Sequence, residues 1–195
     1  MLMPKQDLPI ITIGIVVLNR EWIIGRMLNS LQSQTYPHDK LFVVVIDGKS
    51  NDRTVDIVED IMLKSNFKGY QVIVQDTNIP EVRNLCIQNM KGDFLLFWDS
   101  DVIMEPAAIE KGFQLLKKEN VDITCSFVKE VTVTSEDEVD IKWEEWKNSL
   151  HKVKTNSNIG VLGNNLISRK VFADIKFDPN LSIYEDRDFI ERLQN

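Results

Sequence analysis

The first two thirds of the chain alternate short apolar runs with segments whose apolar residues recur every three or four positions. Apolar runs of this kind predict buried strands, and the spaced residues predict amphipathic helices. Four strand–helix pairs in succession predict an α/β fold with a mostly parallel central sheet, flanked by helices and joined by right-handed crossovers. The predicted strands are 11–18, 41–46, 72–74 and 94–98, and the predicted helices lie near 24–35, 55–62, 81–90 and 106–118.

The remainder of the sequence has a less regular pattern. It contains no internal repeat, linker or low-complexity tract, so a single domain over residues 1–195 is expected. The predicted elements are one or two strands in 121–133, a helix bearing Trp143 and Trp146 in 138–150, a polar and mobile connection in 152–159, a strand or turn in 160–167, and helices from 168 and from 185.

Composition narrows the functional classes. With 195 residues, of which 43% are hydrophobic, the chain can bury a core without disulfides, and Cys86 and Cys125 are expected to be reduced core thiols. No stretch is typical of a signal peptide or a transmembrane helix, so we expect a cytoplasmic protein, free or peripheral at a membrane. The net charge of −7 argues against a nucleic-acid partner.

Two carboxylates follow the most apolar run in the sequence. Asp99 and Asp101 stand directly behind residues 94–98, at the carboxyl end of a predicted buried strand, where ligands of open α/β sheets bind. Mg²⁺ and Mn²⁺ are usually held by one or two carboxylates together with substrate phosphates. The pair therefore predicts a metal and a diphosphate ligand, although a solvated Asp-Ser-Asp turn explains the residues equally well.

Two further acidic segments occupy element ends. Asp47 ends the second predicted strand, ahead of a loop in which Ser50 or Asp52 can cap the next helix. A free carboxylate at Asp47 could accept a hydrogen bond from a nucleobase N–H. In the last helix, positive potential at the N-terminus keeps Asp186 ionised, and an ionised carboxylate can take a proton from an attacking hydroxyl. Acidic residues are also favoured in a first helical turn for structural reasons alone.

Taken together, the ordered motifs resemble the family-2 glycosyltransferases of the GT-A fold, over nearly the whole chain. The segments that carry the resemblance are Leu18-Asn19-Arg20, residues 31–37, the D-x-x-S-x-D-x-T run of 47–54, Val82-Arg83-Asn84 with Gly92-Asp93, Asp99-Ser100-Asp101, Gly163-Asn164-Asn165 and residues 185–189.

The resemblance implies a role for each matching residue. Residues 1–101 would form the nucleotide-sugar half and 102–195 the acceptor and catalytic half. The implied roles are donor binding for Asn19, Asp47, Arg83, Asp99 and Asn164, with Asp47 reading the base; metal binding for Asp101 directly and for Asp99; and general base for Asp186, with Asp188 as the fallback. No histidine follows Glu185-Asp186, so diphosphate oxygens and water are expected to complete the metal's ligands.

The resemblance implies a metal-dependent inverting glycosyltransferase of the hexosyltransferase type, using Mn²⁺ or Mg²⁺. Its donor would be a UDP- or GDP-sugar, and its acceptor a glycan, a glycoprotein or a lipid-linked molecule. Two alternatives stay open. A haloacid-dehalogenase-type phosphatase also has a strand-borne D-x-D, although that motif normally opens its domain. A non-catalytic domain that binds a sugar nucleotide or a glycan would carry the same binding residues.

Overall fold

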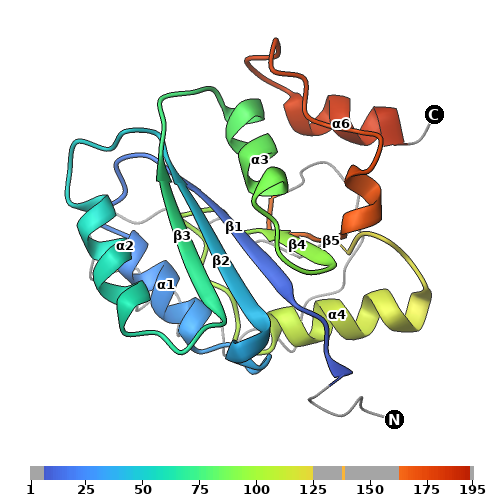
Figure 1. Cartoon of the computed structure of the whole chain (residues 1–195), viewed down its shortest axis with the longest axis horizontal. Helices are drawn as coiled ribbons and strands as arrows, with labels where there is room; N and C mark the ends of the chain where they lie inside the picture. Colours follow the sequence, from blue (N-terminus) through green and yellow to red (C-terminus); the bar gives the residue numbers. More distant parts are fainter. Residues whose placement is uncertain (1–6, 125–137, 139–162, 194–195) are drawn as a thin grey trace.

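A five-stranded, mostly parallel sheet forms the centre of the molecule (Figure 1). The computed structural model describes residues 7–124, 138 and 163–193. The strand order is β3-β2-β1-β4-β5; all neighbouring pairs are parallel except β4 and β5, which are antiparallel. The strands are β1 (Ile11–Val17), β2 (Leu41–Asp47), β3 (Gly69–Val74), β4 (Phe94–Phe97) and β5 (Leu166–Ser168).

The crossover segments between these strands contain the helices expected from the apolar spacing. The helices are α1 (Ile24–Gln32), α2 (Thr54–Leu63), α3 (Ile79–Gln88), α4 (Ala108–Glu119) and α6 (Glu185–Leu193), with short 3₁₀ turns η2 (His38–Lys40) and η4 (Arg169–Phe172). The fold prediction of a single α/β unit with a mostly parallel sheet is therefore confirmed for the described part of the chain.

Alternation along the strands builds two cores, one on each face of the sheet. Ile11, Ile13 and Ile15 of β1 point to one face and pack with apolar residues of α1, α2 and α4. The other face is covered by α3, η4 and α6, which pack on side chains that include Val44 and Phe97. Because both faces are covered, the inner strands read as continuous apolar runs in the sequence.

Several boundaries differ from the sequence prediction. β3 begins at Gly69, three residues before the predicted strand, because its ladder to β2 continues through Phe42 and Val43. Of the strands predicted in 121–133, the described residues show an isolated antiparallel bridge between Ile123 and Ile167. The Trp-bearing helix, apart from the helical Glu138, and the polar connection 152–159 lie outside the described residues.

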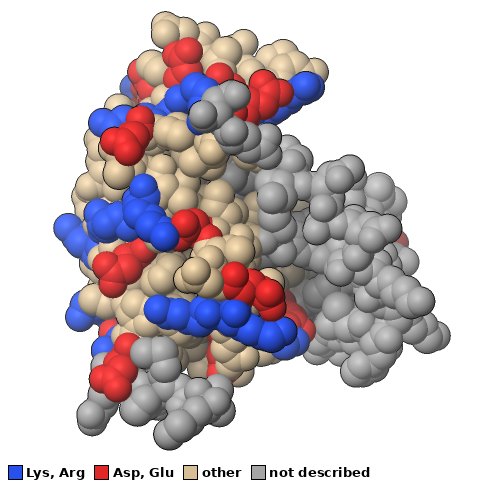
Figure 2. Space-filling model, turned by 90° about the vertical axis from the view of Figure 1, so that its right-hand side faces the viewer, with Lys and Arg blue, Asp and Glu red and all other residues tan. Residues whose placement is uncertain are grey.

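The surface shows no dominant charge on the face drawn in Figure 2. Lys and Arg side chains are interspersed there with Asp and Glu, whereas a nucleic-acid surface gathers basic side chains. Within the described ranges, no helix is both long enough and apolar enough to cross a bilayer.

Candidate functional site

The polar residues singled out in the sequence follow the carboxyl ends of β1, β2 and β4. These strands are parallel neighbours, so their carboxyl ends meet at one edge of the sheet. Asn19 lies two residues beyond β1, Asp47 is the last residue of β2, and Asp99 lies two residues beyond β4. The sheet thereby brings three widely separated positions to the same edge.

Asn19 and Asp47 fasten the loops after β1 and β2 to each other through Ser50. The Ser50 N–H and hydroxyl donate to the two carboxylate oxygens of Asp47, at 2.8 and 2.5 Å. The Asn19 N–H donates to Ser50 Oγ at 2.8 Å, and Asn19 Oδ1 accepts from the Asn51 N–H at 2.9 Å. Asp47 is fully buried and Asn19 is exposed, so at this edge Asn19 is the more accessible of the two.

Of the two residues predicted to cap helix α2, Asp52 and not Ser50 bonds to its first turn. Ser50 does not cap it, because its hydroxyl is committed to Asp47. Arg53 occupies the N-cap position and makes no side-chain capping bond. Asp52 accepts the Thr54 N–H at 2.9 Å, so it satisfies the first helical donor from one residue further out. Its other oxygen accepts from the Glu21 N–H at 3.1 Å, which adds a second link to the loop after β1.

Asp99 is held in a cradle made by Gly163 and Asn164. Asn164 Nδ2 donates to Asp99 Oδ2 at 2.8 Å, and the Asp99 N–H donates back to Asn164 Oδ1 at 3.1 Å. A Cβ at Gly163 would overlap Asp99 Oδ2 and lie 3.0 Å from its Cγ, so only glycine leaves room for this carboxylate. Asn164 adopts a left-handed conformation with φ of 62°, which asparagine tolerates better than most residues.

The pKa of Asp99 is raised above its ordinary value, chiefly because the carboxyl group is buried. The positive charge of Arg83 and the hydrogen bond from Asn164 lower the pKa of Asp99. The negative charges of Asp101 and Asp186 raise it further. Charges interact more strongly in a partly buried site than in water. Asp99, Asp101, Arg83 and Asp186 therefore form one electrostatic cluster, which we call the acidic cluster.

Arg83 reaches the last helix. Its Nε lies 3.4 Å from Glu185 Oε1, and its Nη2 lies 3.1 Å from Asp186 Oδ1. All three side chains are largely buried, with exposed fractions of 11%, 12% and 14%. The sequence suggested a bidentate contact from Arg83 to phosphate or to Asp99; in the structure Arg83 forms ion pairs with Glu185 and Asp186.

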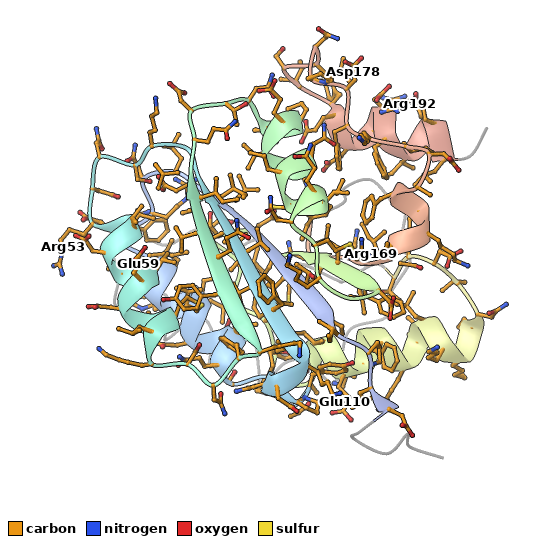
Figure 3. The ribbon with its side chains drawn as sticks, viewed as in Figure 1. Arg53, Glu59, Glu110, Arg169, Asp178 and Arg192 are labelled. Atoms are coloured by element: carbon orange, nitrogen blue, oxygen red, sulfur yellow. The ribbon has the colours of Figure 1, made fainter. Side chains whose placement is uncertain are left out.

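Asp188, the fallback for the general base, is paired with a residue of its own helix. Its Oδ2 accepts from Arg192 Nε at 2.9 Å, on the same helix. Figure 3 shows Arg192 on α6 near Asp178, at the outer end of the molecule. The structure thus joins Asp186, but not Asp188, to the residues around Asp99.

Two residues of this region were not assigned a role from the sequence. Asn84 Nδ2 donates to the Phe177 carbonyl at 2.8 Å, and Asn84 Oδ1 accepts from the Phe177 N–H at 3.0 Å. The Phe177 ring lies beside Arg83, with its centroid 5.5 Å from Cζ. The partners are 93 residues apart, so no local pattern could have revealed this contact.

The acidic cluster suits a divalent cation only in part. Asp99 and Asp101 offer two hard oxygen ligands, and Asp101 is exposed. Among residues 7–124, 138 and 163–193, no three His, Cys, Asp or Glu side chains are grouped closely enough to hold a metal. The donor set therefore fits an ion that brings most of its ligands with it, as Mg²⁺ and Mn²⁺ do when they bind a diphosphate.

Comparison with known proteins decides which family this edge belongs to. The model of glycosyl transferase family 2 matches residues 12–176, which include the two loops after β1 and β2, Arg83, the D-x-D pair and Asn164. The chain belongs to glycosyl transferase family 2. This membership and the sheet topology together confirm the predicted GT-A fold, and they leave the phosphatase alternative without support.

Relatives of this glycosyl transferase family 2 chain include bacterial enzymes. This chain is 31% identical over 113 residues to the poly(ribitol-phosphate) β-N-acetylglucosaminyltransferase TarS of Staphylococcus aureus (strain Mu50). The match covers 58% of this chain and 20% of TarS. It is 32% identical over 122 residues to a poly(ribitol-phosphate) β-glucosyltransferase of Bacillus spizizenii, covering 61% and 19%. The chain matches about a fifth of the length of these relatives.

Solved structures show the same fold. The complex of S. aureus TarS 1–349 with UDP superposes with a TM-score of 0.72 at 23% identity, covering 94% of this chain and 54% of that one. A mannosyltransferase from Pyrobaculum calidifontis, in complex with GDP-Man and Mn²⁺, superposes with a TM-score of 0.70 at 17% identity, covering 97% and 53%.

Proposed function

We propose that this chain transfers a sugar from a nucleoside-diphosphate sugar to an acceptor hydroxyl, with inversion at the anomeric carbon and with a divalent metal. The first half, residues 1–101, binds the donor, and the second half, residues 102–195, supplies the acceptor side and the base. Membership of glycosyl transferase family 2 supports the class of reaction. The residues of the acidic cluster support the assignment of the donor to the first half of the chain and of the base to the second half.

The observation that carries the proposal is the ion pair between Arg83 and Asp186, whose nearest atoms lie 3.1 Å apart. The same guanidinium packs on Phe97, the last residue of β4, at 5.3 Å, so the first turn of α6 is linked to the strand end that Asp99 follows. An inverting transfer needs this arrangement, because the base must act on the acceptor while the diphosphate departs from the opposite face of the sugar.

The roles on the donor side follow from position and accessibility. Asp101 is exposed at the sheet edge and is assigned as the direct metal ligand, with Asp99 as the second carboxylate. A bound metal would stabilise the negative charge that develops on the leaving diphosphate. Asn164 fixes the Asp99 side chain, so it supports the donor site through that residue.

The base and ribose of the donor are assigned to the loops after β1 and β2. Asn19 and the loop that Asp47 organises line this part of the edge. Asp47 is buried, so a hydrogen bond from the base to its carboxylate requires the loop at residues 48–51 to shift. The complexes of structural relatives contain UDP, UDP-GlcNAc and GDP-Man, which makes UDP- and GDP-sugars the donors to test first.

The reaction step assigned to Asp186 is proton removal. The acceptor oxygen forms a bond to the anomeric carbon while the bond from that carbon to the diphosphate oxygen breaks. The proton of the acceptor hydroxyl passes to the Asp186 carboxylate, and the electron pair of the broken bond leaves on the nucleoside diphosphate. Arg83 Nη2 lies 3.1 Å from Asp186 Oδ1, so the carboxylate assigned to accept the proton stands beside a cation.

The decisive experiment combines binding and product analysis. Calorimetry should detect UDP or GDP binding that requires Mn²⁺ or Mg²⁺ and is lost in EDTA. Incubation with the matching nucleotide sugar and a panel of acceptors, beginning with poly(ribitol phosphate) and followed by glycans and lipid-linked sugars, should yield a glycoside of inverted configuration. Retention of configuration would refute the assignment of Asp186. Binding without transfer or hydrolysis over long incubation would instead favour a non-catalytic binding domain.

A further inference from the structure

The Arg83 guanidinium packs against two aromatic rings. Its Cζ lies 5.3 Å from the centroid of the Phe97 ring at the end of β4 and 5.5 Å from that of Phe177. These separations are within the range of cation–π attraction. The two rings meet edge to face, with centroids 5.9 Å apart, so the guanidinium has a fixed site between β4 and the segment that leads to α6.

The segment that carries Phe177 is itself tied to α3. Asn84, the residue after Arg83, exchanges two hydrogen bonds with the backbone of Phe177. Asn78, the N-cap of α3, donates from Nδ2 to the Pro179 carbonyl at 2.8 Å. Phe177 also stacks on Phe189 of α6, with centroids 4.5 Å apart and ring planes 20° apart. Figure 1 shows the result, with α3 and α6 side by side at one end of the molecule.

The guanidinium then spans the first two residues of α6. Nε faces Glu185 and Nη2 faces Asp186, so one planar cation contacts two neighbouring carboxylates. Both contacts are ion pairs and not hydrogen bonds, so the attraction is electrostatic and is strengthened by burial. A guanidinium held between two rings in this way places a positive charge at a defined position beside Asp186.

We propose that Arg83 is a positioning residue for the transfer reaction: through its contacts with Glu185 and Asp186 it sets the place and orientation of the Asp186 carboxylate, and it does not bind the donor diphosphate. This inference rests on the proposed function of Asp186 as the base. Its physical basis is that the guanidinium is engaged by two rings and two carboxylates of the chain itself. A general base must lie within hydrogen-bond reach of the proton it removes, so a small displacement of Asp186 is enough to slow the reaction.

The test measures turnover and donor binding in the same preparations. Turnover is followed as hydrolysis of UDP-GlcNAc or GDP-mannose, whichever the parent consumes, with water in place of the unidentified acceptor. Binding is followed by calorimetry of UDP or GDP with Mn²⁺. Arg83→Gln should lower kcat by roughly 10²–10⁴-fold, the usual contribution of a placed general base, and should leave the Kd for the metal–nucleotide complex unchanged.

Non-additivity distinguishes action through Asp186 from an independent role. Asp186→Asn should lower kcat to a similar extent, and the double variant Arg83→Gln/Asp186→Asn should be no slower than Asp186→Asn alone. Arg83→Lys should recover part of kcat, since it restores the charge without the planar guanidinium that packs on Phe97 and Phe177. Arg187→Gln is the matched control, because Arg187 lies on α6 but is exposed and paired with Glu191.

A stability control separates positioning from folding. Arg83→Gln leaves two largely buried carboxylates without their cation, which lowers stability. Arg83→Gln/Glu185→Gln removes one of those charges and should regain stability while kcat stays low. If kcat returns with stability, Arg83 is structural and the inference is wrong. If Arg83→Gln weakens metal–nucleotide binding and its effect adds to that of Asp186→Asn, Arg83 is a diphosphate ligand. Failure of the proposed function is distinct, since it appears in the parent as an absence of metal-dependent nucleotide binding or of turnover.

Discussion

A single exposed carboxylate at the sheet edge separates metal binding from folding. Asp101 is exposed, and its side chain is not part of either core. Asp101→Ala should therefore abolish the metal dependence of nucleotide binding, because the change removes one of two charged ligands from a cation with few protein ligands. Calorimetry of UDP and GDP, with Mn²⁺ and with EDTA, measures this directly.

Glu59 provides the control for Asp101. It is an exposed acid on α2, which Figure 3 places on the opposite side of the sheet from α6. Glu59→Ala removes the same charge and should leave nucleotide binding and its metal dependence unaltered. An Asp101→Ala protein with parental Mn²⁺ dependence would remove Asp101 from the metal site.

Gly163 controls the donor-side carboxylate by its lack of a side chain. In Gly163→Ala the new Cβ would overlap Asp99 Oδ2, and the carboxylate would have to rotate away from Asn164. The end of a side chain moves more easily than backbone, so the stability loss should be no more than about 1–3 kcal/mol. Metal-dependent nucleotide binding should fall much further, because Asp99 is displaced.

Gly112→Ala is the matched substitution for this test. A Cβ there would lie 3.6 Å from Thr124 Oγ1, an ordinary contact, and alanine is favoured over glycine inside α4 by about 1 kcal/mol. Chemical denaturation and calorimetry on both variants provide the comparison. Unchanged nucleotide binding in Gly163→Ala would show that the cradle around Asp99 has no part in the donor site.

At the scale of elements, α3 is the helix that organises the catalytic end of the molecule. It packs on β1 and β2, and its N-cap Asn78 and its residues Arg83 and Asn84 contact the segment from 177 to 186. Asn84→Ala removes two hydrogen bonds and leaves the Phe177 backbone groups without these partners, at a stability loss of about 1–3 kcal/mol. Hydrogen exchange should rise at Phe177 and in the first turn of α6, and kcat should fall with it.

Asn89 is the control at the other end of the same helix. Its Nδ2 donates to the Leu85 carbonyl at 2.9 Å, within α3, so it makes a local contact and none with α6. Asn89→Ala should leave exchange at Phe177 as in the parent. Equal protection of Phe177 in Asn84→Ala and the parent would contradict the view that α3 anchors α6.

At the scale of the whole molecule, the two covered faces of the sheet protect a thiol. Burial raises the pKa of Cys86 to about 12, with the Arg83 cation opposing the shift. The thiol is therefore uncharged in the native state at pH 8, and iodoacetamide should react with it only when the molecule opens. In a Cys125→Ser background Cys86 is the one remaining thiol, and native labelling should be far slower than labelling in denaturant.

The same shift fixes a dependence of stability on pH. The native pKa of Cys86 lies above the ordinary thiol value of 9.0, so the stabilisation that comes from burying the uncharged thiol is fully present below pH 9. It is lost as the pH rises from 9 toward 12, because the unfolded thiol ionises first. Denaturation at pH 8 and 10.5, compared with Cys86→Ala, should show a smaller loss of stability in the variant. Native labelling as fast as in denaturant would place Cys86 at the surface.

The sequence determined the elements, because apolar periodicity records which side of each strand or helix is buried. It therefore gave the order of strand–helix pairs, the parallel sheet and the carboxyl-end positions of Asp47 and Asp99. It also gave the free core thiol at Cys86. The sequence predicted the ends of strands less accurately, as β3 shows, because a strand continues for as long as the neighbouring strand provides hydrogen-bonding partners.

Only the tertiary structure decided which side chains meet. The ion pairs of Arg83 with Glu185 and Asp186, and the hold of Asn164 on Asp99, join residues 65 or more positions apart in the chain. A charged residue carries no local sign of its partner, since the energy of an ion pair depends on separation in space and on burial. The sequence could thus locate Asp99 and Asp101 at the sheet edge, whereas the fold alone determined that Arg83 faces α6.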